Sequence, residues 1–208
     1  MTAPFGEVRI VDDVPAAFAD LVVEEAPESV ALSGGGLARR CYAALAARDV
    51  DWRGVTVLLG DERRVPVDHD DSNEGMARRV LLDHVKPVTV HSMVGLGADR
   101  YDELVRALPP VELVHLGLGA DGHTASLFPG APQLDVEDRF VVEAGDDAHP
   151  HPRITFTLPA IARSQLAVVT VAGEEKRDAW RRLCAGEDLP AQRIRATRVI
   201  WLVAPDAL

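Results

Sequence analysis

Residues 111–130 have the sequence VELVHLGLGADGHTASLFPG, the most informative stretch of the chain. Its first six residues are mostly apolar and predict a buried strand. The strand runs into a glycine-rich turn that carries Asp121 and His123. Sheets of the α/β class keep their ligands and catalytic groups at the carboxyl ends of strands. The stretch therefore predicts an α/β fold with an enzymatic site at Asp121 and His123.

Outward from this stretch, apolar runs alternate with helical patterns along the whole chain. Strands are predicted at residues 8–11, 29–32, 55–59, 88–91, 111–116, 140–143, 153–158, 167–171 and 199–203. Helices are predicted at residues 15–25, 37–48, 72–84, 100–108 and 174–184. The alternation predicts a three-layer α/β sandwich with a mainly parallel, Rossmann-like doubly wound sheet. No repeat or linker divides the chain, so we expect one domain over residues 1–208. Residues 144–152 are the best candidate for an exposed connection.

The composition limits the partners of the protein. Lys and Arg total 22 and Asp and Glu total 33, which gives a formal net charge of −11. This charge disfavours nucleic acid and anionic membranes as partners. It does not exclude a small anion, because surface charge is screened over about 8 Å at physiological salt. Cys41 and Cys184 form no redox or metal motif, and free thiols suit a reducing cytoplasm. We expect no signal peptide and no membrane span.

Two more strand ends carry unusual loops, and a parallel sheet would bring all three loops to one edge. In the first, Ser33, Gly34, Gly35 and Gly36 follow a strand and lead into a helix. The backbone N–H groups at such a helix start attract anions, so this loop is a candidate phosphate cradle. The alternative is a tight strand-to-helix turn that holds no ligand.

The second loop places Asp61 and Glu62 beside two arginines, directly after a buried strand. The Arg63 guanidinium can bind a phosphate or carboxylate with two parallel hydrogen bonds. Asp61 or Glu62 could orient that guanidinium. The alternative is a solvated charge run, which is the commoner role of such a sequence in isolation.

The third loop imitates a nucleotide-binding motif, because residues 117–122 fit the pattern GxGxxG. That motif requires a helix to begin at its last glycine, whereas Pro129 and Gly130 end the segment too early. A nicotinamide or flavin site is therefore disfavoured. His123 is the candidate general base, since an imidazole accepts protons near neutral pH, and Asp121 could hold its tautomer. His115, inside the apolar strand, is instead expected to be a hydrogen-bonded core residue.

Further cations follow later in the chain. Arg153 begins a predicted strand, with Thr155 and Thr157 on the same face, and these three could contact a polyol or phosphate. Lys176 lies near the start of the last long helix and could be a second cation for an anionic ligand. The alternative for Arg153 and the two threonines is an amphipathic strand with one solvated face. The alternative for Lys176 is a surface lysine that binds no ligand.

No metal site and no nucleophilic serine are predicted. His149 and His151 have the wrong spacing for helical ligands, and no HExxH or CxxC occurs. Ser126 does not lie in a GxSxG elbow, so packing or helix capping is its expected role.

At these residues the chain resembles the 6-phosphogluconolactonases. The matching segments are LSGG at 32–35, GDER at 60–63 with VP at 65–66, DSN at 71–73, GLGADGHTASLFPG at 117–130 and RIT at 153–155. The resemblance implies hydrolysis of 6-phospho-D-glucono-1,5-lactone to 6-phospho-D-gluconate, in the pentose phosphate pathway. It implies an enzyme without metal or organic cofactor, whose partner is the phosphorylated sugar lactone. A cytoplasmic monomer or weak homo-oligomer is expected.

The resemblance also implies roles for individual residues. His123 would be the general base with Asp121 beside it, and Arg63 would be an active-site cation. The residues implied to bind substrate are Ser33, Gly34, Gly35, Gly36, Asp61, Asn73, Gly119, Arg153 and Lys176. The chain departs from the family's usual SGGST loop at Gly36 and Leu37. Hydroxyl contacts to the phosphate are lost there, and the nearby Arg39 and Arg40 are candidates to replace them.

Two alternative functions stay open. Glucosamine-6-phosphate deaminases and isomerases share the fold and a GxDGH motif, but they carry an acid in the run after the histidine. Residues 126–129 of this chain, SLFP, contain no acid. A non-catalytic sugar-phosphate-binding module is the other alternative, although the chain has no basic helix-turn-helix segment.

Overall fold

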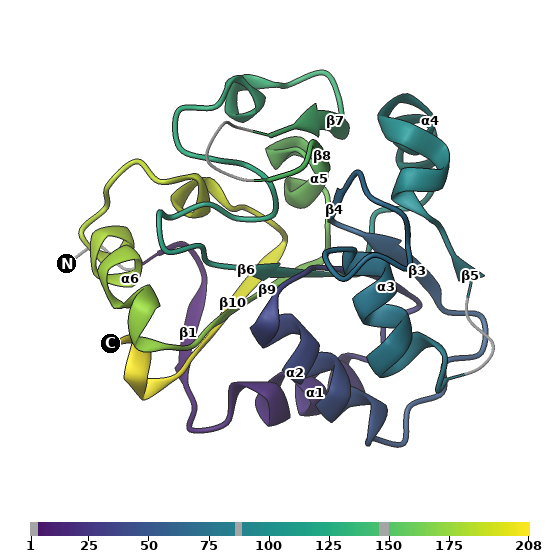
Figure 1. The fold of residues 1–208 in the computed structure, drawn as a ribbon. Coiled ribbons are helices and arrows are strands. Elements are labelled where there is room, and N and C mark those ends of the chain that lie inside the picture. The colour runs from purple at the N-terminus through teal and green to yellow at the C-terminus, as the bar shows by residue number, and fades with distance from the viewer. Residues whose placement is uncertain (1–3, 86–88, 146–149) are drawn as a thin grey trace.

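A computed structural model describes residues 4–85, 89–145 and 150–208 (Figure 1). The strands are β1 (Glu7–Ile10), β2 (Ser29–Leu32), β3 (Thr56–Leu59), β4 (Asp61–Arg63), β5 (Thr89–Val90), β6 (Leu113–Gly117), β7 (Val141–Ala144), β8 (Arg153–Phe156), β9 (Leu166–Val171) and β10 (Arg198–Val203). The α-helices are α1 (Val14–Glu25), α2 (Gly36–Ala46), α3 (Asn73–Ala77), α4 (Met93–Ala107), α5 (Leu158–Ala162) and α6 (Arg177–Cys184). Short helical turns are η1 (Arg78–Leu82), η2 (Pro132–Asp135), η3 (Glu174–Lys176), η4 (Pro190–Arg193) and η5 (Pro205–Ala207).

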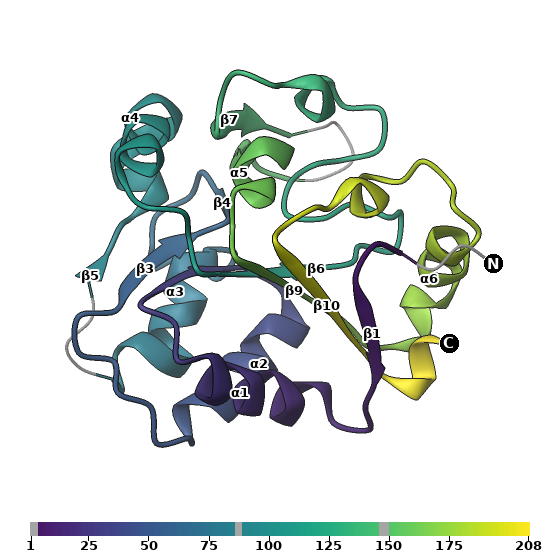
Figure 2. The ribbon, with the colours of Figure 1, turned by 180° about the vertical axis from the view of Figure 1, so that it is seen from behind.

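The large sheet confirms the predicted α/β fold with a mainly parallel sheet. Its seven strands lie in the order β1-β10-β9-β6-β2-β3-β5, and every pair is parallel. The chain winds outward from β2 through β3 to β5, and then from β6 through β9 to β10. The switch point therefore lies between β2 and β6, where open α/β sheets bind ligands. Helices α1, α2 and α3 lie on one side of this sheet, and α4 and α5 lie on the other (Figures 1 and 2).

A second, antiparallel sheet with the order β4-β8-β7 was not predicted from the sequence. The segment expected to be the loop after β3 instead turns at Gly60 and continues as β4. The Gly60 N–H donates to Leu32 O at 2.7 Å, and its carbonyl accepts from Phe156 N at 2.7 Å. One residue thus joins the small sheet to the large one.

Three predicted helices differ clearly from the structure, whereas α1 and α2 lie within two residues of their predicted bounds. The predicted helix 72–84 begins after Ser72, whose hydroxyl accepts from Gly75 N at 2.9 Å, but it changes to the π-helical turn η1 at Arg78. Helix α4 is longer than predicted, and Gly97 interrupts it with a φ of 75°. The predicted helix 174–184 is divided into η3 and α6.

Smaller differences concern the strands. The predicted strand 153–158 ends at Phe156, because Thr157 caps helix α5, which the sequence did not predict. The predicted strand 88–91 is β5 in the structure, and residue 88 lies outside the described residues. Residues 146–149 of the predicted exposed connection also lie outside them.

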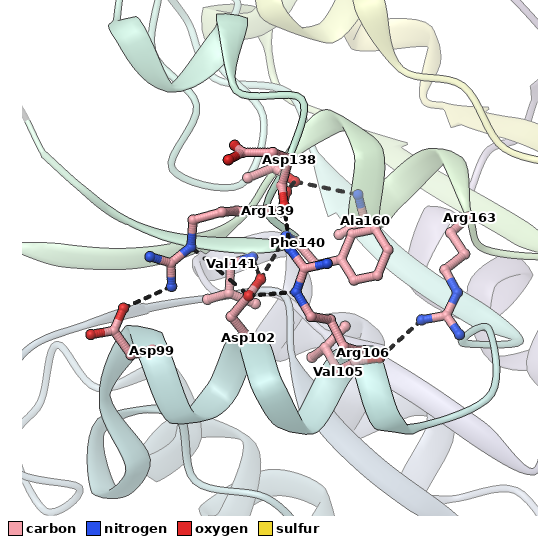
Figure 3. Close-up of polar contacts among 11 residues, drawn as sticks. Asp99, Asp102, Val105, Arg106, Asp138, Arg139, Phe140, Val141, Ala160 and Arg163 are labelled. Atoms are coloured by element: carbon pink, nitrogen blue, oxygen red, sulfur yellow. Dashed lines mark hydrogen bonds and ion pairs between the residues drawn. The ribbon is translucent and has the colours of Figure 1, made fainter.

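Helix α4 holds the small sheet in place through Asp102, whose side chain is almost fully buried (Figure 3). The Asp102 carboxylate accepts from Phe140 N at 2.6 Å, Val141 N at 2.9 Å and Arg106 Nε at 2.7 Å. Burial acts to raise the pKa of Asp102, but the Arg106 hydrogen bond and the two backbone N–H groups lower it below its ordinary value. Asp102 is therefore an ionised link between α4 and the start of β7.

Within the described part of the chain, no helix is both long enough and apolar enough to cross a lipid bilayer.

Candidate active site

The first glycine loop lies between β2 and α2, at the switch point of the large sheet. Gly35 has a φ of 95°, which lets the chain turn from the strand into the helix. Gly34 lies against Asn73, and a Cβ at this position would be 1.8 Å from Asn73 Oδ1. The first N–H groups of α2 have no partner within the helix. N–H groups in this position can accept an anion, so the candidate phosphate cradle stays a prediction.

A chain of hydrogen bonds between buried side chains holds this loop in place. Ser33 N donates to the Tyr42 hydroxyl at 2.7 Å, and that hydroxyl is 2.8 Å from His115 Nδ1. His115 Nε2 is 3.0 Å from Thr170 Oγ1, at the end of β9. Burial lowers the pKa of His115 to about 3, so the ring is neutral at physiological pH. His115 is the hydrogen-bonded core residue that the sequence predicted.

The third loop, residues 117–130, folds into a tight turn around His123. Gly119 N donates to His123 O at 2.8 Å, and Gly122 N donates to Gly119 O at 3.0 Å. The imidazole lies against Gly119, where a Cβ would be 2.2 Å from His123 Nδ1. Gly119 therefore provides the space that the imidazole occupies.

Asp121 holds both the backbone and the ring of His123. Its Oδ1 accepts from His123 N at 3.0 Å and lies 2.6 Å from His123 Nδ1. Burial acts to raise the pKa of Asp121, but the backbone N–H, the charge and the ring hydrogen bond of His123 lower it below its ordinary value. A carboxylate at Nδ1 places the ring proton there and makes Nε2 the basic nitrogen. Asp121 braces the loop and is not among the residues that line the cavity.

Two arginines from the small sheet face this site. Arg63 on β4 and Arg153 on β8 are directly paired in the antiparallel register. Arg63 Nη1 donates to Asp71 O at 2.7 Å, and Arg63 Nε is buried with no hydrogen-bond partner among the described residues. Arg153 Nη1 is 3.4 Å from Ser126 Oγ, and its guanidinium lies 5.6 Å from the centre of the Phe128 ring.

The two acids before Arg63 do not orient its guanidinium, which corrects the sequence hypothesis. The Glu62 carboxylate accepts from Arg63 N, Asn73 N and Glu74 N at 2.7–2.8 Å, and so caps the start of α3. Asp61 Oδ2 accepts from Ser126 Oγ at 2.7 Å, and its backbone oxygen accepts from Asn73 Nδ2 at 2.9 Å. Both acids position the loops around the site.

The three loops surround one cavity of about 550 Å³. His123, Arg63 and all nine residues predicted to bind substrate line it, whereas Asp121 does not. Its charged lining residues are Arg39, Arg40, Arg63, Arg153, Lys176, Asp61 and Glu175. This cavity in an acidic protein is therefore predominantly cationic, as an anionic ligand requires. Thr155 and Thr157 do not line it; Thr155 Oγ1 accepts from Ser126 N at 3.1 Å, and Thr157 caps α5.

A family model described as glucosamine-6-phosphate isomerases/6-phosphogluconolactonase matches residues 8–201. The chain belongs to this family. A 6-phosphogluconolactonase from Synechocystis sp. is 38% identical over 207 residues, covering 89% of this chain and 85% of that protein. A 6-phosphogluconolactonase from Nostoc sp. is 36% identical over 197 residues, covering 84% of this chain and 81% of that protein. The structure of a 6-phosphogluconolactonase from Leishmania guyanensis has a TM-score of 0.83 and 28% identity, and the match covers 97% of each chain.

Some of the cavity lining of this family member was not predicted from the sequence. Thr170 and Ala172 line it from the end of β9, and Glu175 lines it from η3. These residues could have been found from the predicted strand 167–171, because its carboxyl end lies at the same sheet edge as the glycine loops. Arg39 and Arg40 line the cavity from the first turns of α2. Their position fits the expectation that they replace the missing Ser-Thr hydroxyls, and that role stays a prediction.

Proposed function

We propose that the protein hydrolyses 6-phospho-D-glucono-1,5-lactone to 6-phospho-D-gluconate, a step of the pentose phosphate pathway. The observation that carries the proposal is the 2.6 Å contact between Asp121 Oδ1 and His123 Nδ1 beside a cationic cavity. Relatives named 6-phosphogluconolactonase at 36–38% identity support the same activity. We infer a cytoplasmic enzyme, since the described chain has two free cysteines and no membrane-spanning helix.

In this mechanism His123 is the general base. Asp121 keeps the proton on Nδ1, so Nε2 takes a proton from a water molecule. The water oxygen then forms a bond to the lactone carbonyl carbon. A δ-lactone is an activated ester, so one water, one base and a stabiliser for the oxyanion are sufficient. Asp121 stabilises the imidazolium that develops and stays ionised, in keeping with its lowered pKa.

The tetrahedral intermediate carries its negative charge on the former carbonyl oxygen. Backbone N–H groups of the glycine loops or the Arg63 guanidinium stabilise this oxyanion. When the intermediate collapses, the bond between the carbonyl carbon and the ring oxygen breaks. The His123 imidazolium returns its proton to that oxygen, which gives the open-chain hydroxy acid and restores the neutral base.

The phosphate holds the substrate at a distance from the reacting carbon. The N-terminus of α2 with Arg39 and Arg40, together with Arg153 and Lys176, offers N–H groups and positive charges for this purpose. Binding energy from this remote group orients the lactone against His123 and the attacking water.

The deaminase alternative lacks a suitable acid. The two cavity-lining carboxylates among the described residues are Asp61 and Glu175. Asp61 already accepts from Ser126 and Asn73, and Glu175 lies on η3, outside the run that follows His123. Ammonia release from glucosamine 6-phosphate would favour the deaminase. Binding of 6-phosphogluconate without lactone turnover would favour a non-catalytic binding module.

The decisive experiment measures acid release from freshly generated lactone, with the spontaneous rate subtracted. We expect His123→Ala to lower kcat by about 10²–10⁴-fold, the usual contribution of general-base catalysis. The thermal midpoint of unfolding should stay close to that of the wild type. The matched control is His84→Ala, because the exposed His84 bonds to Arg79 O and lies outside the cavity lining. An unchanged kcat in His123→Ala would exclude His123 as the base.

A further inference from the structure

Two histidines and an aspartate converge outside the active-site cavity. His69 and Asp71 lie in the loop between β4 and α3, and His151 lies just before β8. One candidate ligand atom from each residue lies within 4.8 Å of those of the other two. None of the three side chains lines the cavity or takes part in the proposed reaction.

The distances suit a metal ion with nitrogen and oxygen ligands. His151 Nε2 is 3.0 Å and His69 Nδ1 is 3.9 Å from Asp71 Oδ2. A tetrahedral ion with bonds of about 2.0–2.2 Å needs ligand atoms about 3.3–3.6 Å apart. Small side-chain rotations therefore bring the three atoms to the distances that Zn²⁺ requires.

The backbone around the three residues is already arranged for this convergence. Arg64 N donates to Pro152 O at 2.8 Å, which fixes the two segments side by side. Asp71 N donates to His69 Nδ1 at 3.1 Å, which holds the His69 ring beside Asp71 with Nδ1 unprotonated; an ion bound at this nitrogen would replace that hydrogen bond. His151 has a φ of 72°, a conformation uncommon for a residue with a Cβ, and it directs the ring toward Asp71.

A hydrogen bond between the two segments explains part of this arrangement. The contact between His151 and Asp71 would join the two segments without a metal ion. It does not by itself place the second imidazole there: the His69 ring, held by Asp71 N, lies 5.5 Å from the His151 ring, with Nδ1 3.9 Å from the same Asp71 oxygen. Asp68 and Asp70 flank His69 in the sequence and add negative charge to the same loop.

We propose that His69, Asp71 and His151 bind one Zn²⁺ ion, or a similar borderline divalent cation, with water as the remaining ligand. Two imidazoles and one carboxylate are ligands typical of zinc, whereas Ca²⁺ and Mg²⁺ prefer oxygen ligands alone. The ion joins the loop after β4 to the segment before β8. It thereby ties together the segments next to Arg63 and Arg153, since Asp71 O also accepts from Arg63.

The test is calorimetric titration of the chelator-treated full-length protein with ZnCl₂, and with CoCl₂ for its visible absorption. We expect one equivalent to bind, the thermal midpoint to rise with Zn²⁺, and excess MgCl₂ not to compete. His151→Asn tolerates the positive φ, and His69→Asn keeps an acceptor for Asp71 N. Each should weaken Zn²⁺ binding by about 10–100-fold or more, since even indirect partners of a metal contribute that much.

Two control variants separate this site from other histidines. His123→Ala removes the imidazole of the cavity, and His84→Ala removes an exposed imidazole elsewhere; both should bind Zn²⁺ as the wild type does. The ligand variants should keep the metal-free thermal midpoint of the wild type within a few degrees. No Zn²⁺ binding by the wild type, or binding that persists in both ligand variants, would overturn the proposal.

Discussion

At the scale of single residues, the site depends on close contacts between side chains and glycines. The sequence predicted that Asp121 and His123 act together, because two residues of that type in one glycine turn have few other uses. It could not predict that Gly119 provides the space for the imidazole, nor that Asp121 braces the loop from outside the cavity. Both facts depend on the three-dimensional path of the turn, and no local sequence pattern reveals that path.

Gly119→Ala tests the importance of this space. The new Cβ would be 2.2 Å from His123 Nδ1, so the imidazole must move. We expect kcat for the lactone to fall by about 10²-fold, since a displacement of about 1 Å at a catalytic group costs that much. The matched control is Gly117→Ala in the same loop, where a Cβ meets no atom within 4 Å, and it should keep most of kcat. Equal losses of kcat in both variants would show that activity depends on the conformation of the whole loop and not on the position of the His123 ring.

At the scale of elements, the central strands and helices α1 and α2 were predictable to within two residues, whereas β4 and the pairing of the small sheet were not. Strand β2 has the predicted bounds, because a short apolar run before glycines has one interpretation. Strand β4 has only three residues, two acids and an arginine, and this composition is typical of a loop. It becomes a strand because β8, some 90 residues later in the chain, pairs with it. Such a long-range contact leaves no local pattern.

Asp102→Asn tests how α4 holds the small sheet. The variant loses the charge that binds Arg106, so we expect the free energy of unfolding at pH 7 to fall by about 1–3 kcal/mol. The folded-state pKa of Asp102 is lowered from 3.8, so its contribution is complete above that value. It is lost as the pH falls through the lowered pKa, and wild type and variant should then converge. Urea unfolding at several pH values measures this difference.

The control for that experiment is Asp99→Asn on the same helix. Asp99 pairs with Arg139 at 2.7 Å, but its side chain is 85% exposed. Exposed ion pairs contribute about 0–1 kcal/mol, so this variant should change stability little. If both variants lost the same stability, burial of Asp102 would not be the cause.

At the scale of the whole molecule, the large sheet determines where the site lies. The strand order places β6, β2 and β3 next to one another, so the loops that follow them meet at one edge. The sequence predicted this convergence from the parallel topology alone. It also predicted that an acidic chain could hold a local group of cations, and the cavity lining contains one. The contribution of the small sheet, which carries both Arg63 and Arg153, required the three-dimensional structure.

His115 makes the stability of the whole molecule dependent on pH. Its pKa is lowered to about 3 in the folded protein by burial, against 6.5 for an ordinary histidine. The unfolded chain therefore binds a proton more readily, and stability present above pH 6.5 is lost as the pH falls toward 3. The expected slope between these values is about 1.4 kcal/mol per pH unit.

His115→Phe should reduce this slope, because Phe keeps a ring against Phe18 but cannot bind a proton. Tyr42 would retain its hydrogen bonds to Ser33. The measurement is the free energy of unfolding in urea from pH 7 to pH 4. An unchanged slope, or an NMR titration that placed the pKa of His115 near its ordinary value, would contradict the assignment.

The direct pairing of Arg63 with Arg153 across β4 and β8 links folding to ligand concentration. Like charges opposite each other weaken an antiparallel pair, and a bound anion removes that repulsion. Any anion that binds only the folded state adds stability that grows with its concentration. Inorganic phosphate should therefore raise the thermal midpoint of the wild type, most at low ionic strength, and raise it less in Arg153→Gln. The amount of folded enzyme would then follow the supply of its own phosphorylated ligands.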